Sequence, residues 1–122
     1  MKKVLILMLI FGIFVSVTNL EAQKKSKKPI EGKVVSINDL AIGSFQTWTK
    51  DAAEAEAGKG TPFVFMSGTG KKAQIYFVYN EDGTFASKKL AKYAHNAKVG
   101  IVGTVKKVNG INILIMEIIE AM

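Results

Sequence analysis

Residues 99–115 have the sequence Val-Gly-Ile-Val-Gly-Thr-Val-Lys-Lys-Val-Asn-Gly-Ile-Asn-Ile-Leu-Ile, and this stretch decides the fold class. Two runs rich in β-branched residues, 98–108 and 111–120, flank the dipeptide Asn109-Gly110. Asn-Gly between apolar runs is a strong signal for a two-residue type I′ turn, because both central positions of that turn need a positive φ. The sequence therefore predicts a long antiparallel hairpin here.

The second strand of this hairpin is apolar on both faces. We expect Ile113 and Ile115 on the core side, although Leu114 and Met116 on the opposite side are equally apolar. A strand with one face in water should not have two apolar faces. Either the protein's own chain covers the second face, or this final strand meets a partner, for example a second copy in a homo-oligomer.

Three further strands and two helices are expected upstream. The expected strands lie at 32–37, 63–66 and 74–80, where β-branched and aromatic residues gather, and the last two form a hairpin. Between the first two strands, Asn38-Asp39 has the composition of a turn, and the stretch 40–48 is ambiguous.

The two expected helices have recognisable start signals. Asp51 and Glu54 have the spacing of a capping box at the start of an alanine-rich helix over 51–57. Ser87 is the expected N-cap of a second helix over 87–96, which has apolar residues at helical spacing. The expected order is therefore strand, short helix, two strands, helix, two strands.

This order resembles the oligonucleotide/oligosaccharide-binding (OB) barrel, which has five strands and a helix between the third and fourth. The resemblance covers about residues 30–120, and 99–115 is similar to the closing hairpin of small exported bacterial OB-fold proteins, where glycines let strands bend. The expected fold is mainly β: a small OB-like five-stranded barrel with a helix between strands 3 and 4 and a short helix inserted between strands 1 and 2. No catalytic or ligand-binding motif accompanies the resemblance.

Residues 1–22 have the pattern of a signal peptide. Lys2 and Lys3 precede the apolar run 4–17, and a run of about 14 residues is short for a membrane span, which needs roughly 20. We expect cleavage that leaves Gln23 first, export to the periplasm or the medium, and no membrane span after cleavage. An uncleaved N-terminal anchor is the alternative, whereas the absence of Cys excludes a lipoprotein.

Residues 23–29 are expected to form a basic disordered arm ahead of an OB-like domain over 30–122. The arm is polar and contains four lysines, Lys24, Lys25, Lys27 and Lys28. Loss of residues 1–22 takes away two Lys and one Glu from the 17 Lys and 10 acidic residues, which leaves a net charge of +6. Four of these charges belong to the arm, so the domain itself is only weakly basic.

The residue types exclude most enzyme classes. The chain has no Cys and one His, which removes thiolate metal sites, multi-histidine sites and cysteine nucleophiles. His95 has no partner motif and is expected at a helix end. The stretch 68–72 contains Gly-Lys but has Phe65 where a phosphate loop needs its first glycine. The sequence thus predicts a protein that is not an enzyme and that binds no cofactor or metal.

Aromatic and lysine residues supply the candidate ligand surface. Alternation places Phe77 and Tyr79 on one face of a strand and Tyr76 on the other. We expect Phe63, Phe65, Phe77 and Tyr79 to fill the barrel, since a small barrel fills its interior first. Tyr76 is then the outward aromatic. The candidate surface for a ligand or polyanion is the following set: Tyr76, Lys71, Lys72, Lys24, Lys25, Lys27 and Lys28.

Two functions are compatible with these observations. The first is a non-enzymatic, exported binding domain for a small ligand or a protein partner in the cell envelope. The alternative is a module that binds polyanions or single-stranded nucleic acid through its lysines. The chain has no Arg, which argues against base-specific recognition, whereas lysines alone support salt-sensitive phosphate binding.

Overall fold

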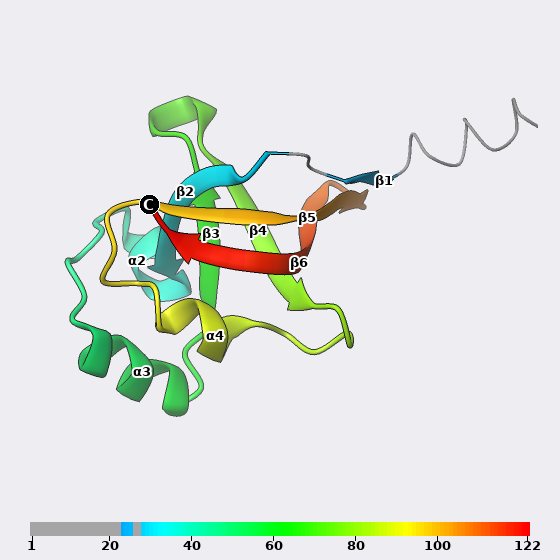
Figure 1. Ribbon diagram of the computed structural model, residues 1–122. Coiled ribbons are helices and arrows are strands. Elements are labelled where there is room, and N and C mark those ends of the chain that lie inside the picture. Colours follow the sequence, from blue (N-terminus) through cyan, green and yellow to red (C-terminus); the bar gives the residue numbers. More distant parts are fainter. Residues whose placement is uncertain (1–22, 26–27) are drawn as a thin grey trace, which may run out of the picture.

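The computed structural model describes residues 23–25 and 28–122 (Figure 1). The signal peptide predicted for residues 1–22 lies outside the described residues. The elements, in chain order, are β1 (Gln23–Lys25), β2 (Ile30–Ser36), α2 (Ile37–Ile42), α3 (Lys50–Gly58), β3 (Phe63–Ser67), the 3₁₀ turn η1 (Gly70–Lys72), β4 (Gln74–Asn80), α4 (Ser87–Ala91), β5 (Val99–Val108) and β6 (Ile111–Ala121).

Five of the strands close into a barrel. The neighbours around it are β5, β2, β3, β4 and β6, and β6 pairs with β5 to complete the circuit. All of these pairs are antiparallel except β4–β6, which is parallel. With α4 between the third and fourth barrel strands, this order confirms the predicted mainly β, OB-like five-stranded barrel. The helix expected between the first two strands is also present, as α3.

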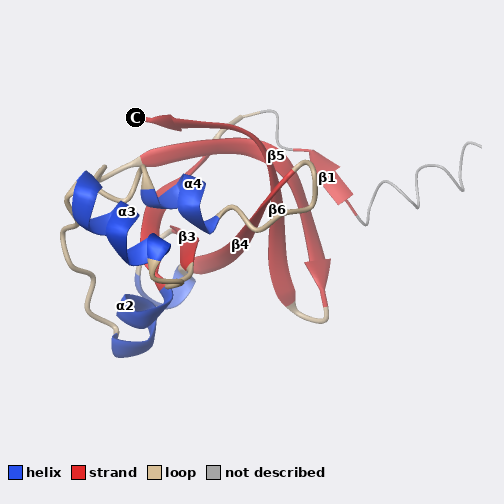
Figure 2. Cartoon of the chain, turned by 90° about the horizontal axis from the view of Figure 1, so that it is seen from below, coloured by secondary structure: helices blue, strands red, loops and turns tan. Residues whose placement is uncertain are grey.

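The helices α3 and α4 lie side by side across one end of the barrel (Figures 1 and 2). They contribute small side chains that let helix and barrel approach closely, Ala53 and Ala57 from α3 and Ala91 from α4. The core itself consists of inward side chains from every barrel strand, and its largest fully buried members include Phe63, Phe65, Ile101 and Leu114. This packing makes the helical end of the barrel part of the core.

The β5–β6 hairpin has the predicted turn. Asn109 and Gly110 have φ values of 49° and 84°, both positive, as a type I′ turn requires. The register shifts between Val102 and Gly103, so that Glu117 is an extra residue in β6. Such a bulge exchanges the two faces of the strand beyond it.

The core side of β6 differs from the prediction. Leu114 and Met116 are buried in the core, whereas Ile113 and Ile115 lie on the opposite face and are only partly buried. Both faces are apolar, so alternation alone identified the two sets without showing which set points inward.

Three local predictions need correction. Asn38-Asp39 belongs to helix α2, which Ser36 caps through a bond from Asp39 N and which ends at Gly43 with φ 80°. Thr49, rather than Asp51, caps α3. Ser87 does not cap α4, which ends at Ala91 and is shorter than the predicted helix.

The N-terminal arm also differs from the prediction in part. Gln23–Lys25 pair with β5 as the short strand β1, in register with residues 104–106. Strand β2 pairs only with residues 99–101 of β5, which leaves backbone donors and acceptors further along that edge for β1. Pairing of backbone groups needs no apolar side chain, which explains why a polar, lysine-rich sequence forms a strand here.

Candidate functional site

The faces of β4 are the reverse of those predicted. Val78 is fully buried in the core, and Tyr76, two residues away on the same face, packs against the core and contacts the Phe65 ring at 6.4 Å between centroids. Phe77 and Tyr79 therefore lie on the outer face of the barrel. The prediction is confirmed for Phe63 and Phe65, which are inside, and is wrong for Phe77 and Tyr79. Tyr76 is half-buried rather than an outward aromatic.

An aromatic cluster covers the middle of this outer face. Phe85, from the segment after β4, forms a bridge with Tyr79 and lies 5.3 Å from its ring and 6.5 Å from the Phe77 ring. Ile113 and Ile115 of β6 stand beside Phe77 and Tyr79 in the parallel register. The second apolar face of β6 thus adjoins side chains of the same chain. Because β6 pairs with strands on both sides, self-association through it would have to use side chains rather than a free edge.

Beyond this cluster, near the start of β4, the outer face contains an open apolar groove of about 490 Å³. We call this feature the apolar groove. Leu40 and Phe45 form one wall, and Met66 and Ile75 line it from β3 and β4. Thr69, Gly70 and Ala73 complete the lining. Phe45 is 40% exposed, so a large aromatic side chain stands at the rim with much of its surface in water.

Asp39 fixes the loop that supplies Phe45. Its carboxylate accepts bonds from Gln46 Nε2 at 3.2 Å and from Trp48 Nε1 at 3.3 Å, and both residues follow Phe45 in the loop. Asp39 is only 7% exposed, and the Trp48 ring packs edge-on against Phe63. One buried carboxylate therefore connects α2, the groove loop and the core.

Replacing Asp39 by alanine is expected to destabilise the protein by about 1–3 kcal/mol, because two donors lose their acceptor at a largely buried position. Chemical denaturation followed by the fluorescence of Trp48, the single tryptophan, measures this change. Asn38→Ala, an exposed change in the same helix, is the matched control and should stay within about 0.5 kcal/mol. Equal effects of the two changes would contradict the role given to Asp39.

The turn after β4 contains a second carboxylate that accepts bonds from its own loop. The Oδ1 atom of Asp82 accepts from Thr84 Oγ1 at 2.6 Å and from Thr84 N at 3.0 Å. These two bonds favour the charged form and hold the pKa of Asp82 below its usual value of 3.8.

Replacing Thr84 by valine removes the hydroxyl donor, so the pKa of Asp82 should rise toward its usual value while the backbone bond remains. A lowered pKa in the folded state stabilises the fold above the unfolded-state pKa, and this contribution disappears as the pH falls through the folded-state pKa. A carbon-detected NMR titration of the carboxyl group measures the shift. Thr84→Ser retains the hydroxyl and should leave the pKa unchanged; a rise in the serine variant would contradict this explanation.

The structure does not bring the predicted site residues together. Lys71 and Lys72 are exposed in η1, next to groove residue Gly70, and Lys28 is exposed ahead of β2. Lys24 and Lys25 contribute backbone to β1, and Lys27 lies outside the described residues. Leu40 and Phe45, the groove wall, were missed because Leu40 belongs to α2, whose Asn38-Asp39 was predicted as a turn, and Phe45 lies in the loop after that helix.

The described part of the chain has neither a cluster of metal-ligating side chains nor a membrane-spanning helix. Within residues 23–25 and 28–122, no three His, Asp or Glu side chains converge as metal ligands. No helix in these ranges is long and apolar enough to cross a bilayer. Comparison with protein-family models, with curated proteins and with solved structures finds no match to this chain. The geometry of the protein's own surface is therefore what points to a function.

Proposed function

We propose that this protein is a non-enzymatic, exported binding domain, and that the apolar groove receives the apolar part of a small ligand or of a protein partner in the cell envelope. The observation that supports this most strongly is the groove itself. It is open and almost entirely apolar, and Asp39 holds its rim in place. Binding sites for small molecules have this character, with apolar walls and few polar groups.

The surroundings of the groove support the same proposal. Ile42, at the end of α2 and three residues before Phe45 in the chain, is 75% exposed, so the segment that supplies the groove wall carries a second exposed apolar side chain. Exposed apolar side chains in the segment beside a groove suit a protein partner, which can insert one side chain into the groove and cover the others. Export is proposed from the pattern of residues 1–22.

Cyclohexanol is a suitable probe of the apolar groove, and amide NMR shifts locate where it binds. We expect shifts at Met66 and Ile75 in the unmodified protein. Phe45→Ala removes one wall and should weaken this binding about fivefold, equivalent to about 1 kcal/mol of lost contact. Ile42→Ala removes an exposed side chain that does not line the groove and should leave the affinity within about twofold.

Either of two outcomes would overturn the proposal. The first is a set of cyclohexanol shifts centred away from Met66 and Ile75. The second is an equal loss of affinity in the Phe45 and Ile42 variants, which would indicate a non-specific apolar surface. A thermal melt of each variant confirms that the comparison is made between folded proteins.

A further inference from the structure

A second cleft, of about 700 Å³, lies at the opposite end of β4 from the apolar groove. We call it the lysine cleft. It is bounded by the end of α3, by the segment leading into β3 and by α4. Its lining residues are Ala57, Gly60, Thr61, Pro62, Asn80, Phe85, Ala86, Ser87, Lys88, Lys89 and Lys92. About five residues of β4, or roughly 17 Å, separate it from the groove.

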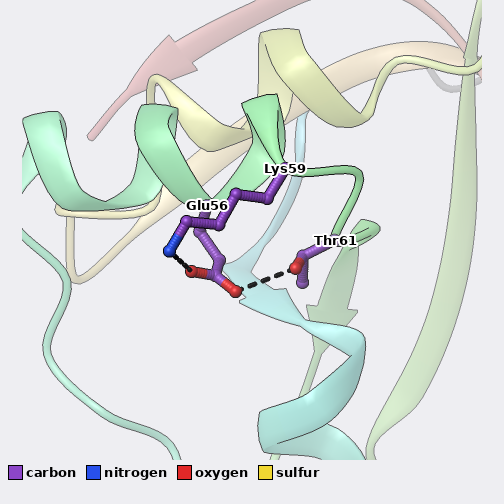
Figure 3. Close-up of polar contacts among 3 residues, drawn as sticks. All are labelled: Glu56, Lys59 and Thr61. Carbon is purple, nitrogen blue, oxygen red and sulfur yellow. Dashed lines mark hydrogen bonds and ion pairs between the residues drawn. The ribbon is translucent and has the colours of Figure 1, made fainter.

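One wall of the lysine cleft is fixed by hydrogen bonds of its own. The Thr61 hydroxyl donates to Glu56 Oε1 at 2.9 Å, and Lys59 Nζ lies 3.8 Å from the other oxygen of the same carboxylate (Figure 3). Ser87 Oγ accepts from Phe63 N at 2.7 Å, which ties α4 to the start of β3. These groups hold the wall together.

The charge of the cleft comes from Lys88, Lys89 and Lys92. All three are exposed and belong to α4 or follow it directly, and the spacings of three and four residues place Lys92 beside the other two. None of them takes part in the ion pairs Lys59–Glu56 and Lys98–Glu31 that described residues form. The Glu56 carboxylate is already engaged by Lys59 and Thr61. Three positive charges therefore border one concave surface.

Apart from Thr61, Asn80 and Ser87, the rest of the lining is apolar. Ala57, Pro62, Ala86 and the ring of Phe85 line the cleft together with the three lysines. Phe85 is 37% exposed, and its other contacts, with Phe77 and Tyr79, support it from the outer face of the barrel. A cationic rim beside a supported aromatic ring complements a ligand that joins an anionic group to a flat apolar body.

We propose that the lysine cleft is a binding site for an organic anion of this kind, a phosphate or carboxylate attached to an aromatic or other flat apolar group. The lysines bind the anionic group, and Phe85 with the alanine and proline side chains contacts the apolar body. None of the residues that line this cleft lines the apolar groove. The site therefore goes beyond the function proposed above, and each of the two proposals can be refuted without the other.

The test titrates the full protein with three probes and follows amide NMR shifts. The probes are 1-naphthyl phosphate, 1-naphthol, which has the same body without the anion, and inorganic phosphate, which has the anion without the body. We expect 1-naphthyl phosphate to shift Ala57, Phe85 and Ser87 and to bind at least about tenfold more tightly than either of the other two probes. Signals of Met66 and Ile75 report the groove separately.

A charge-matched pair of variants tests the role of the lysines. Combining Lys88→Gln, Lys89→Gln and Lys92→Gln should weaken binding of 1-naphthyl phosphate about tenfold, or about 1.4 kcal/mol. The control combines Lys28→Gln, Lys50→Gln and Lys107→Gln, three exposed lysines elsewhere, and should change the affinity less than twofold. Equal weakening in both variants would show non-specific charge attraction and overturn the proposal, as would equal affinity for 1-naphthol.

Discussion

Replacing Gly103 by valine is expected to prevent the barrel from closing, with a loss of more than about 3 kcal/mol or no folded protein at all. Gly103 is buried at the register shift between β5 and β6. A Cβ at this position would overlap the carbonyl oxygen of Ile115 and lie 3.1 Å from Met116 Cα. These are backbone atoms of a paired strand, so they cannot move aside as the end of a side chain could.

Solubility and circular dichroism of the Gly103→Val protein measure this effect, followed by denaturation if it folds. Gly58→Ala is the control, since a Cβ on Gly58 has nothing within 4 Å and its φ is not positive. Alanine at the end of α3 should leave stability unchanged or slightly higher. A Gly103→Val protein as stable as the Gly58 variant would show that the two strands do not approach as described.

Replacing Leu114 by alanine is expected to cost about 2–5 kcal/mol, as for other fully buried leucines. Its neighbour Ile113 lies on the outer face and is partly exposed, so Ile113→Ala should cost only about 1 kcal/mol. Denaturation followed by Trp48 fluorescence ranks the two. The opposite ranking would restore the face assignment that the sequence pattern favoured and would place Phe77 and Tyr79 inside the barrel.

The sequence was sufficient to predict the barrel and the order of its strands and helices. The strongest signals, the turn and the strands beside it, are local in the sequence. Asn109-Gly110 favours a turn with two positive φ values, and the runs on either side are rich in β-branched apolar residues, which is typical of strands. The expected order of strands and helices then matched that of the OB barrel. Strand β1 could not be foreseen, because its pairing depends on where β2 leaves the edge of β5.

The candidate site could not be predicted because its position depends on which face of β4 is inside. Both faces carry aromatic residues, so the choice is made by packing of Val78 and Tyr76 with core residues from distant parts of the chain, such as Leu114. The hydrogen-bond partner of Ser87 also could not be predicted from the local sequence. Its position suggested a local cap, whereas its hydroxyl bonds to Phe63 N, 24 residues away. Long-range contacts of this kind leave no spacing in the sequence.

The lysines illustrate a related difference between composition and structure. By composition, most of the net charge lies in residues 23–29. The predicted surface for a ligand or polyanion therefore included the lysines of this arm, together with Lys71 and Lys72. The structure instead gathers Lys88, Lys89 and Lys92 around a concave surface with an aromatic ring. Concavity arises from α3, α4 and the segment between β4 and α4 together, and no single stretch of sequence contains it.

A crystal structure of the protein grown or soaked with cyclohexanol tests the central proposal most directly. We expect Tyr76 to pack against the core, Phe77 and Tyr79 to lie on the outer face, and cyclohexanol to bind between Phe45 and Ile75. A loop over 43–48 that collapses onto β3 and β4 and fills the groove, leaving cyclohexanol without a place there, would contradict it.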